Sequence, residues 1–229
     1  MGKYRYLFFD LDNTILDFEK CEIYALKRTF DNANICFDDD ILKEYLKINN
    51  DLWKKHDLGI LQQREVLVGR FDILFHKMGV SVSPQVVSDK YQECLSETAF
   101  FEEEALDVIL ALYQSVELFI VSNGNTNTQR SRIKRAGLNK YFKGIFISEE
   151  IGFHKPQREF FEKCFLNIKE FSRGNALIIG DSLSSDILGG INADIHTCWY
   201  NPNAKEKNFD VNPDYEITRM SQILEIVEM

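Results

Sequence analysis

The sequence has little proline, no paired cysteine motif and no long apolar run. Of its 229 residues, 4 are proline and 5 are cysteine, and no two cysteines have CxxC spacing. Scattered, unpaired cysteines are typical of reduced thiols in a cytoplasmic protein, where they pack as small core residues. The 4 histidines lack the spacing of zinc ligands, so a zinc site is not expected.

Positive charge is also scarce. The formal net charge is −9, whereas proteins that bind a nucleic-acid polymer or a membrane surface need a basic face. The basic run at residues 130–135, which includes Arg132, is predicted to be a solvated helix face. The apolar stretch 6–9 stops at Asp10 and is too short for a signal-peptide core or a membrane span. We therefore expect no nucleic-acid polymer, no membrane partner and a cytoplasmic location.

Five short apolar runs predict buried strands, and helical patterns separate most of them. The predicted strands are residues 6–9, 116–121, 145–147, 176–179 and 195–199. From the second strand onward they alternate with predicted helices at 126–136, 156–165 and 185–193. Strand followed by helix, repeated, indicates an α/β fold, a doubly wound parallel sheet with helices on both faces.

Between the first and second predicted strands only helical periodicity is present. Its breaks fall near residues 32–34, 57–59 and 79–84, which leaves roughly four helices before a last one at 103–114. We assign that last helix to the α/β core. The predicted domains are an α/β core of residues 1–17 and 100–229, and a small all-helical domain of residues 18–99 inserted after the first strand.

Acidic or small polar residues follow four of the predicted strands, where ligands lie in open parallel sheets. Those strand ends read Asp10-Leu11-Asp12, Ser122-Asn123-Gly124, Ser148-Glu149-Glu150 and Gly180-Asp181. Residues i and i+2 of an extended segment point the same way, so Asp10 and Asp12 face one site. Two carboxylates so close repel, and they need either a divalent cation or a proton on one of them. Phosphoryl transfer uses both states, with one carboxylate as nucleophile and the other as proton donor.

Four motifs, in order along the chain, resemble those of the haloacid dehalogenase (HAD) superfamily. The apolar strand ending in Asp10-Leu11-Asp12-Asn13-Thr14 is similar to the first motif, and Ser122-Asn123-Gly124 is similar to the second. His154-Lys155-Pro156 is similar to the third, and the segment from Asp181 to Asp186 is similar to the fourth. The resemblance covers the α/β core and implies a HAD-like, Rossmann-type fold. The helical insertion then occupies the position of a type-1 cap.

The resemblance implies a catalytic and metal-binding role for each acidic motif residue. Asp10 would be the nucleophile and a metal ligand, and Asp12 the general acid/base that also offers its backbone carbonyl to the metal. Asp181 would be a further ligand, and Asp186 would act through a metal-bound water or orient Lys155. An all-oxygen, carboxylate-rich site suits Mg²⁺. Mg²⁺ and Lys155 together would reverse the negative field that the net charge creates.

The resemblance also implies a phosphate-binding set. Ser122, Asn123 and Lys155 would bind phosphate oxygens, and Lys155 would also neutralise charge in the transition state. Thr14 either contacts phosphate or caps a turn. Each motif alone also has a purely structural interpretation, such as a strand-to-helix turn at Ser122 or a helix N-cap at Asp181. Four such coincidences in the right order are not expected.

Asp12 distinguishes between the reactions of the superfamily. Haloacid dehalogenases lack an acid at this position because a halide leaving group needs no proton, whereas phosphatases need one. The phosphonate-cleaving branch uses a cap lysine, and we identify none here. We therefore predict a Mg²⁺-dependent phosphomonoester hydrolase that works through an aspartyl-phosphate on Asp10. One alternative, from a different class of protein, is a non-catalytic phosphate-binding regulator. Such a protein usually lacks Asp10 or Asp12, whereas both are present here. A metal-independent dehalogenase is a further alternative.

A cap that closes over a site encloses small soluble molecules. Residues 147–156 and 185–201 are similar to bacterial pyrimidine 5′-nucleotidases, as are two short stretches of the cap. The expected partner is therefore a small phosphorylated metabolite, a nucleoside 5′-monophosphate with preference for pyrimidine deoxynucleotides. In this interpretation Trp53 or Phe71 stacks a base and Arg70 contacts the substrate, with core packing as the alternative for all three. A sugar-phosphate phosphatase of the N-acylneuraminate 9-phosphate or phosphoglycolate type remains the alternative enzyme. The protein itself is expected to be a monomer or a homodimer.

Overall fold

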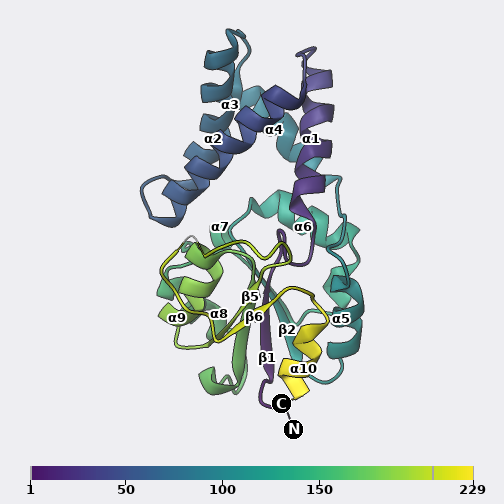
Figure 1. Cartoon of the computed structure of the whole chain (residues 1–229), viewed down its shortest axis with the longest axis vertical. Coiled ribbons are helices and arrows are strands. Elements are labelled where there is room, and N and C mark those ends of the chain that lie inside the picture. The colour runs from purple at the N-terminus through teal and green to yellow at the C-terminus, as the bar shows by residue number, and fades with distance from the viewer. Residues whose placement is uncertain (1, 208, 229) are drawn as a thin grey trace. The chain divides into compact units, whose positions relative to one another are not determined.

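The computed structural model describes residues 2–207 and 209–228 (Figure 1). The chain divides into two compact units, one of Met1–Phe18 with Ala99–Met229 and one of Glu19–Thr98. The first unit contains the sheet, and the second is helical. Among the described helices, none is long and apolar enough to span a membrane.

A six-stranded sheet forms the centre of the first unit. Its strands are β1 (Tyr6–Asp10), β2 (Glu117–Ser122), β3 (Gly144–Ile147), β4 (Ala176–Gly180), β5 (His196–Tyr200) and β6 (Tyr215–Ile217). Within the described residues the order is β3-β2-β1-β4-β5-β6, and every neighbouring pair is parallel. The predicted doubly wound parallel sheet is confirmed, with the first strand in its middle. β6 was not predicted, because three residues with a central glutamate do not form an apolar run.

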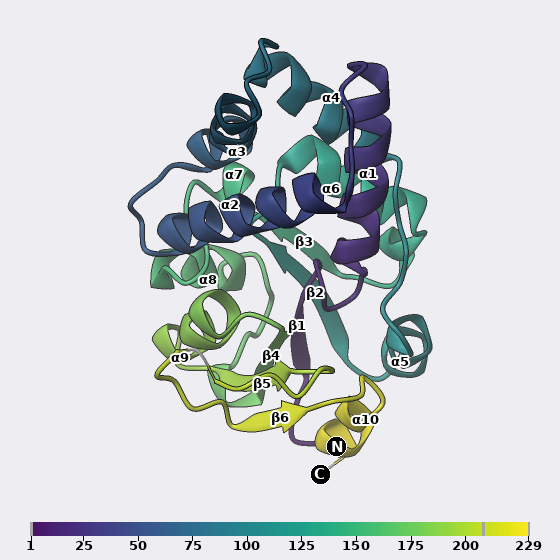
Figure 2. The same cartoon turned by 45° about the horizontal axis from the view of Figure 1, so that its top comes forward.

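Alternate residues of β1 point to opposite faces of the sheet. The helices of this unit are α5 (Ala105–Leu112), α6 (Thr126–Arg135), α7 (Ser148–Ile151), α8 (Arg158–Phe165), α9 (Leu188–Asn192) and α10 (Gln222–Glu228). Leu7 and Phe9 share a buried cluster with α5, α6 and α10, whereas Tyr6 and Phe8 share one with α8. Figure 2 shows α5 and α10 on one side of the sheet and α8 and α9 on the other. Burial on both faces explains why the central strands β1, β2 and β4 are apolar at every position between their first and last residues.

The predicted helix at residues 185–193 begins as a wide π-helical turn, Leu183–Ile187, which continues into α9. The hydroxyl of Ser182 caps this turn by accepting a hydrogen bond from Ser185 N at 3.2 Å. Short 3₁₀ turns at Leu138–Lys140 and Arg173–Asn175 complete the connections of this unit.

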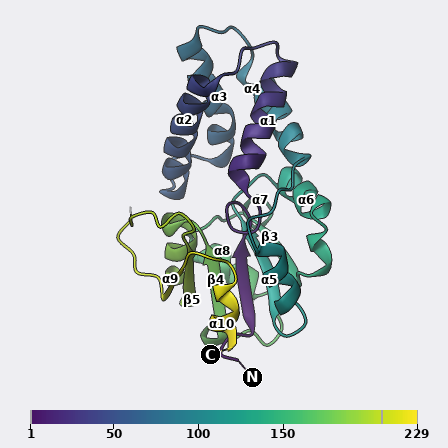
Figure 3. The ribbon, with the colours of Figure 1, turned by 45° about the vertical axis from the view of Figure 1, so that its right-hand side comes forward.

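The second unit is built from helices α1 (Phe18–Asn32), α2 (Asp39–Asp57), α3 (Gln63–Met78) and α4 (Pro84–Ser96) (Figure 3). α3 packs against both α2 and α4. Local signals set the ends of these helices: the Asp38 carboxylate caps α2, Gly79 in the left-handed conformation ends α3, and Pro84 starts α4. The interior contains a group of packed aromatic rings: Phe30, Tyr45, Phe71, Phe75 and Tyr91.

Candidate active site

The carboxyl ends of three adjacent strands bring the motif residues together. β1 pairs with both β2 and β4, so Asp10 at the end of β1 lies between these two strand ends. β2 ends at Ser122, and Asp181 follows directly after β4. This is the edge at which open parallel sheets bind ligands.

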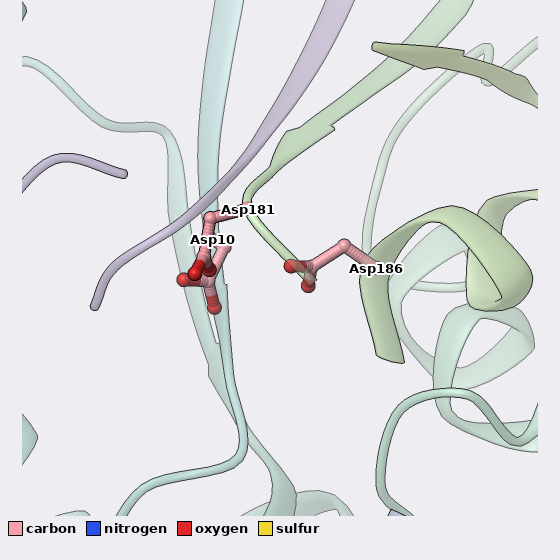
Figure 4. A group of neighbouring side chains, drawn as sticks. All are labelled: Asp10, Asp181 and Asp186. Carbon is pink, nitrogen blue, oxygen red and sulfur yellow. The ribbon is translucent and has the colours of Figure 1, made fainter. Parts of the chain in front are cut away.

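Asp10, Asp181 and Asp186 form a carboxylate cluster (Figure 4). Each offers an oxygen, and these atoms lie within 4.8 Å of one another. Burial raises the pKa of Asp10 to about 7, with Lys155 opposing this and the neighbouring carboxylates adding to it. Burial, together with the charges of Asp10 and Asp186, also raises the pKa of Asp181 well above its ordinary value.

The cluster fits a hard divalent cation. Burial disfavours the charged forms of Asp10 and Asp181, so these carboxylates gain most from a bound cation, and the donor atoms of all three residues are oxygens. Asp10 and Asp181 are the residues that would hold Mg²⁺ directly. The Asp186 carboxylate already has a partner on each oxygen: Lys155 Nζ donates to Oδ1 at 2.7 Å, and Ser182 N donates to Oδ2 at 3.0 Å. This favours the supporting role that was predicted for Asp186.

Lys155 is buried at the centre of the site. Its Nζ donates to Asp10 Oδ1 at 2.5 Å, to Asp186 Oδ1 at 2.7 Å and to the Val121 carbonyl at 3.1 Å, which occupies all three ammonium hydrogens. Burial alone would lower the pKa of Lys155, but the charges of Asp10 and Asp186 outweigh it and raise this pKa. Lys155 is therefore a fixed cation directed at the predicted nucleophile.

Ser122 at the end of β2 and Asn123 directly after it contact the lysine segment and α6. The Asn123 side chain donates to the Lys155 carbonyl at 2.8 Å and accepts from Lys155 N at 2.9 Å. Ser122 is buried, and its Oγ accepts from Gly124 N at 3.1 Å and from Gln129 Nε2 at 2.9 Å. Asn123 thus fixes the backbone of the third motif relative to the second.

Asp12 is held by two residues of α6, Gln129 and Arg132, neither of which was predicted to belong to the site. Arg132 Nη1 donates to Asp12 Oδ1, and Gln129 Nε2 donates to Asp12 Oδ2 at 2.6 Å. The prediction of a solvated basic face is wrong for Arg132, which is 0% exposed. The available signal was helical spacing, because the buried residues of α6 are Thr128, Gln129, Arg132 and Ile133.

The remaining predicted site residues are Thr14 and, in the helical unit, Trp53, Arg70 and Phe71. Thr14 is fully buried, and within the described residues its Oγ1 has no hydrogen-bond partner, so its hydroxyl caps no turn there, and its contact with phosphate stays a prediction. In the helical unit, Phe71 is fully buried against Tyr45 and Tyr91, and Arg70 is buried with Nη1 donating to Asn49 at 3.0 Å. Trp53 is half-buried beside His56. These positions favour packing over substrate contact for Phe71 and Arg70.

Comparison with known proteins identifies the class. Residues 7–200 match the model of the haloacid dehalogenase-like hydrolase family. The chain therefore belongs to this family, as the four motifs predicted, and it is an enzyme of the hydrolase class.

Particular relatives cover almost the whole chain. It is 39% identical to the HAD-hydrolase YfnB of Bacillus subtilis, over 100% of this chain and 97% of YfnB. A crystal structure of YfnB bound to magnesium, which reveals interdomain movement, superposes with a TM-score of 0.95 and covers 99% of this chain and 100% of that one. The chain is also 34% identical to the pyrimidine 5′-nucleotidase PynA of Streptococcus pneumoniae, over 98% of this chain and 95% of PynA. Identity to the pyrimidine 5′-nucleotidase YjjG of Escherichia coli is 27%, over 98% of each chain.

Proposed function

We propose that this protein is a Mg²⁺-dependent phosphomonoester hydrolase that works through an aspartyl-phosphate on Asp10. The observation that carries the proposal is the Asp10 carboxylate itself, bound by Lys155 Nζ at 2.5 Å and clustered with Asp181 at the carboxyl end of the sheet. Asp12, the acid that a phosphatase needs and a dehalogenase does not, lies two residues further on.

The residues of the site divide the reaction between them. When bound, Mg²⁺ supplies positive charge that neutralises the phosphate and orients it. An Asp10 oxygen attacks phosphorus while the bond to the ester oxygen breaks, and Asp12 gives its proton to that leaving oxygen. Asp12 then takes a proton from water as the water oxygen attacks phosphorus, which releases phosphate and restores Asp10. Lys155 holds Asp10 in place and offsets charge throughout.

The proposed substrate is a nucleoside 5′-monophosphate, with pyrimidine deoxynucleotides preferred. Two relatives named pyrimidine 5′-nucleotidases support it, because each aligns with nearly the whole chain, the helical unit included. Small sugar phosphates of the N-acylneuraminate 9-phosphate or phosphoglycolate type are the competing substrates.

The proposal is tested by phosphate release with Mg²⁺ from dUMP, dTMP, UMP, AMP, N-acylneuraminate 9-phosphate and phosphoglycolate. We expect the deoxypyrimidine nucleotides to be hydrolysed fastest and EDTA to abolish turnover. Asp10→Asn is expected to lower kcat at least about a thousandfold, since it removes the nucleophile. Asp107→Asn, on the exposed face of α5, is the matched control and should retain wild-type kcat.

Each other outcome removes a definite part of the proposal. Faster hydrolysis of a sugar phosphate would overturn the substrate assignment and leave the chemistry in place. Phosphate binding without turnover, or an Asp10→Asn variant as active as wild type, would overturn the proposed reaction.

A further inference from the structure

Both carboxylate oxygens of Asp12 are anchored by α6. Arg132 Nη1 donates to Oδ1, and Gln129 Nε2 donates to Oδ2 at 2.6 Å. The Asp12 side chain is 26% exposed, whereas Arg132 is fully buried. A partly solvated carboxylate is thus tied to a fixed cation inside the core.

The Gln129 amide has one permitted orientation. Its Oε1 accepts from Arg132 Nη1 at 2.9 Å, and its Nε2 donates to Asp12 and to Ser122 Oγ at 2.9 Å. Arginine has donors only, so a reversed amide would place two donors against each other. Gly124 makes room for this side chain, because a Cβ there would lie 2.3 Å from Gln129 Nε2. Gln129 therefore joins Asp12 and Ser122 rigidly.

Burial strengthens the link between Arg132 and Asp12. Separating the pair would leave the buried guanidinium without its carboxylate. This loss is strongly destabilising, so the pair resists separation. The Arg132 guanidinium also lies 5.6 Å from the centre of the Phe18 ring, which limits its movement. Among the described residues, the carboxylates that cluster as a metal site are Asp10, Asp181 and Asp186, and Asp12 is not one of them.

We propose that Arg132 and Gln129 are positioning residues for proton transfer by Asp12. They keep the Asp12 carboxylate away from the metal cluster, where it would bind the metal and could not transfer a proton. They also hold it at a fixed position relative to Ser122. A carboxylate has about four lone-pair sites, so two anchored oxygens still leave sites for the transferred proton. Arg132 keeps its own protons throughout, and its effect reaches the reaction only through Asp12. This inference rests on the proposed function.

The proton balance defines the test. Asp12 gives a proton to the leaving oxygen in the first step and removes one from water in the second. A p-nitrophenolate leaving group needs no proton, so only the second step on p-nitrophenyl phosphate depends on Asp12. A nucleotide ester needs Asp12 in both steps.

The experiment compares Arg132→Met, Gln129→Leu and Arg132→Lys with wild type, and uses Arg135→Met, on the exposed face of the same helix, as control. For dUMP, the first two variants should lower kcat about 10–100-fold with KM within about twofold, and Arg132→Lys should recover part of the loss. With p-nitrophenyl phosphate they should release one rapid equivalent of p-nitrophenol and then turn over slowly. Arg135→Met should match wild type on both substrates.

Three results would overturn the inference. One is a folded Arg132→Met or Gln129→Leu protein whose kcat on dUMP equals that of wild type. Another is an equal fall of the burst and steady-state rates in Gln129→Leu, which leaves Arg132 paired with Asp12 and therefore decides the question even if Arg132→Met loses its thermal transition. The third is a wild-type enzyme inactive on every ester, which removes the proposed function as well, whereas the first two leave it intact.

Discussion

At Asp10, burial and charge act in opposite directions on one carboxyl group. Burial raises the pKa from an ordinary 3.8 to about 7, and Lys155 opposes this only in part. In the metal-free folded protein Asp10 therefore keeps a proton between about pH 4 and pH 7, where the unfolded chain has lost it. Because the folded state binds more protons in this range, Asp10 makes stability fall as pH rises from 4 to 7.

Mg²⁺ should consequently stabilise the protein more at pH 8 than at pH 5. The cation binds ionised carboxylates, so at pH 5 it must displace the proton from Asp10. At pH 8 and a Mg²⁺ concentration about 100-fold above Kd, we expect Tm to rise by about 5–10 °C. Thermal unfolding with Mg²⁺ or with EDTA at both pH values measures this. An equal Tm shift at the two pH values would show that Asp10 does not titrate in this range. Asp10→Asn should reduce the pH dependence and leave the part that comes from Asp181, whose pKa is also raised.

At the scale of elements, the carboxyl end of β4 requires glycine at position 180, because Asp186 occupies the space that a side chain would fill. A Cβ on Gly180 would lie 2.3 Å from Asp186 Cγ and Oδ2, and Asp186 is fixed by Lys155 and Ser182. Gly180→Ala should therefore displace Asp186 and Lys155, with kcat at least about tenfold lower and stability about 1–3 kcal/mol lower.

Gly174→Ala is the matched control for Gly180→Ala. Gly174 is exposed, and a Cβ there meets no atom within 4 Å, so kcat and the free energy of unfolding should stay at wild-type values. Urea unfolding and steady-state kinetics on both variants provide the comparison. A Gly180→Ala protein as stable and active as the control would mean that Asp186 can move without consequence.

Some elements of secondary structure could be predicted from the sequence and others could not. β1, β2 and β4 were predictable because burial on both faces makes them apolar runs, and polar residues at their ends or directly after them marked the site. β6 was missed because its three residues form no apolar run, and it is a strand because it pairs with β5. The role of Arg132 was missed because a run of basic residues in sequence separates onto two faces of a helix, and only packing shows which residue lies on the buried face.

At the scale of the whole molecule, the helical unit has its own core. Phe71 lies fully inside it, between other aromatic rings. Phe71→Leu should therefore lower stability by about 0.5–3 kcal/mol and leave the ratio of kcat/KM for dUMP and AMP within about threefold of wild type. Trp53→Leu, at a half-buried position of the same unit, is the comparison variant. A change of that ratio beyond tenfold in Phe71→Leu alone would restore the base-stacking role that the sequence suggested.

The central place of β1 has a consequence for the order in which the chain assembles. Leu7 pairs with Leu118 on one side and Leu177 on the other, and both partners are synthesised after the whole helical unit. Contacts between residues distant in sequence form slowly, whereas helices joined by short turns make mostly local contacts. During synthesis on the ribosome, the helical unit is thus expected to fold before the sheet forms. Asp10, although it lies within the first ten residues, can join Lys155, Asp181 and Asp186 only after the last third of the chain has been synthesised.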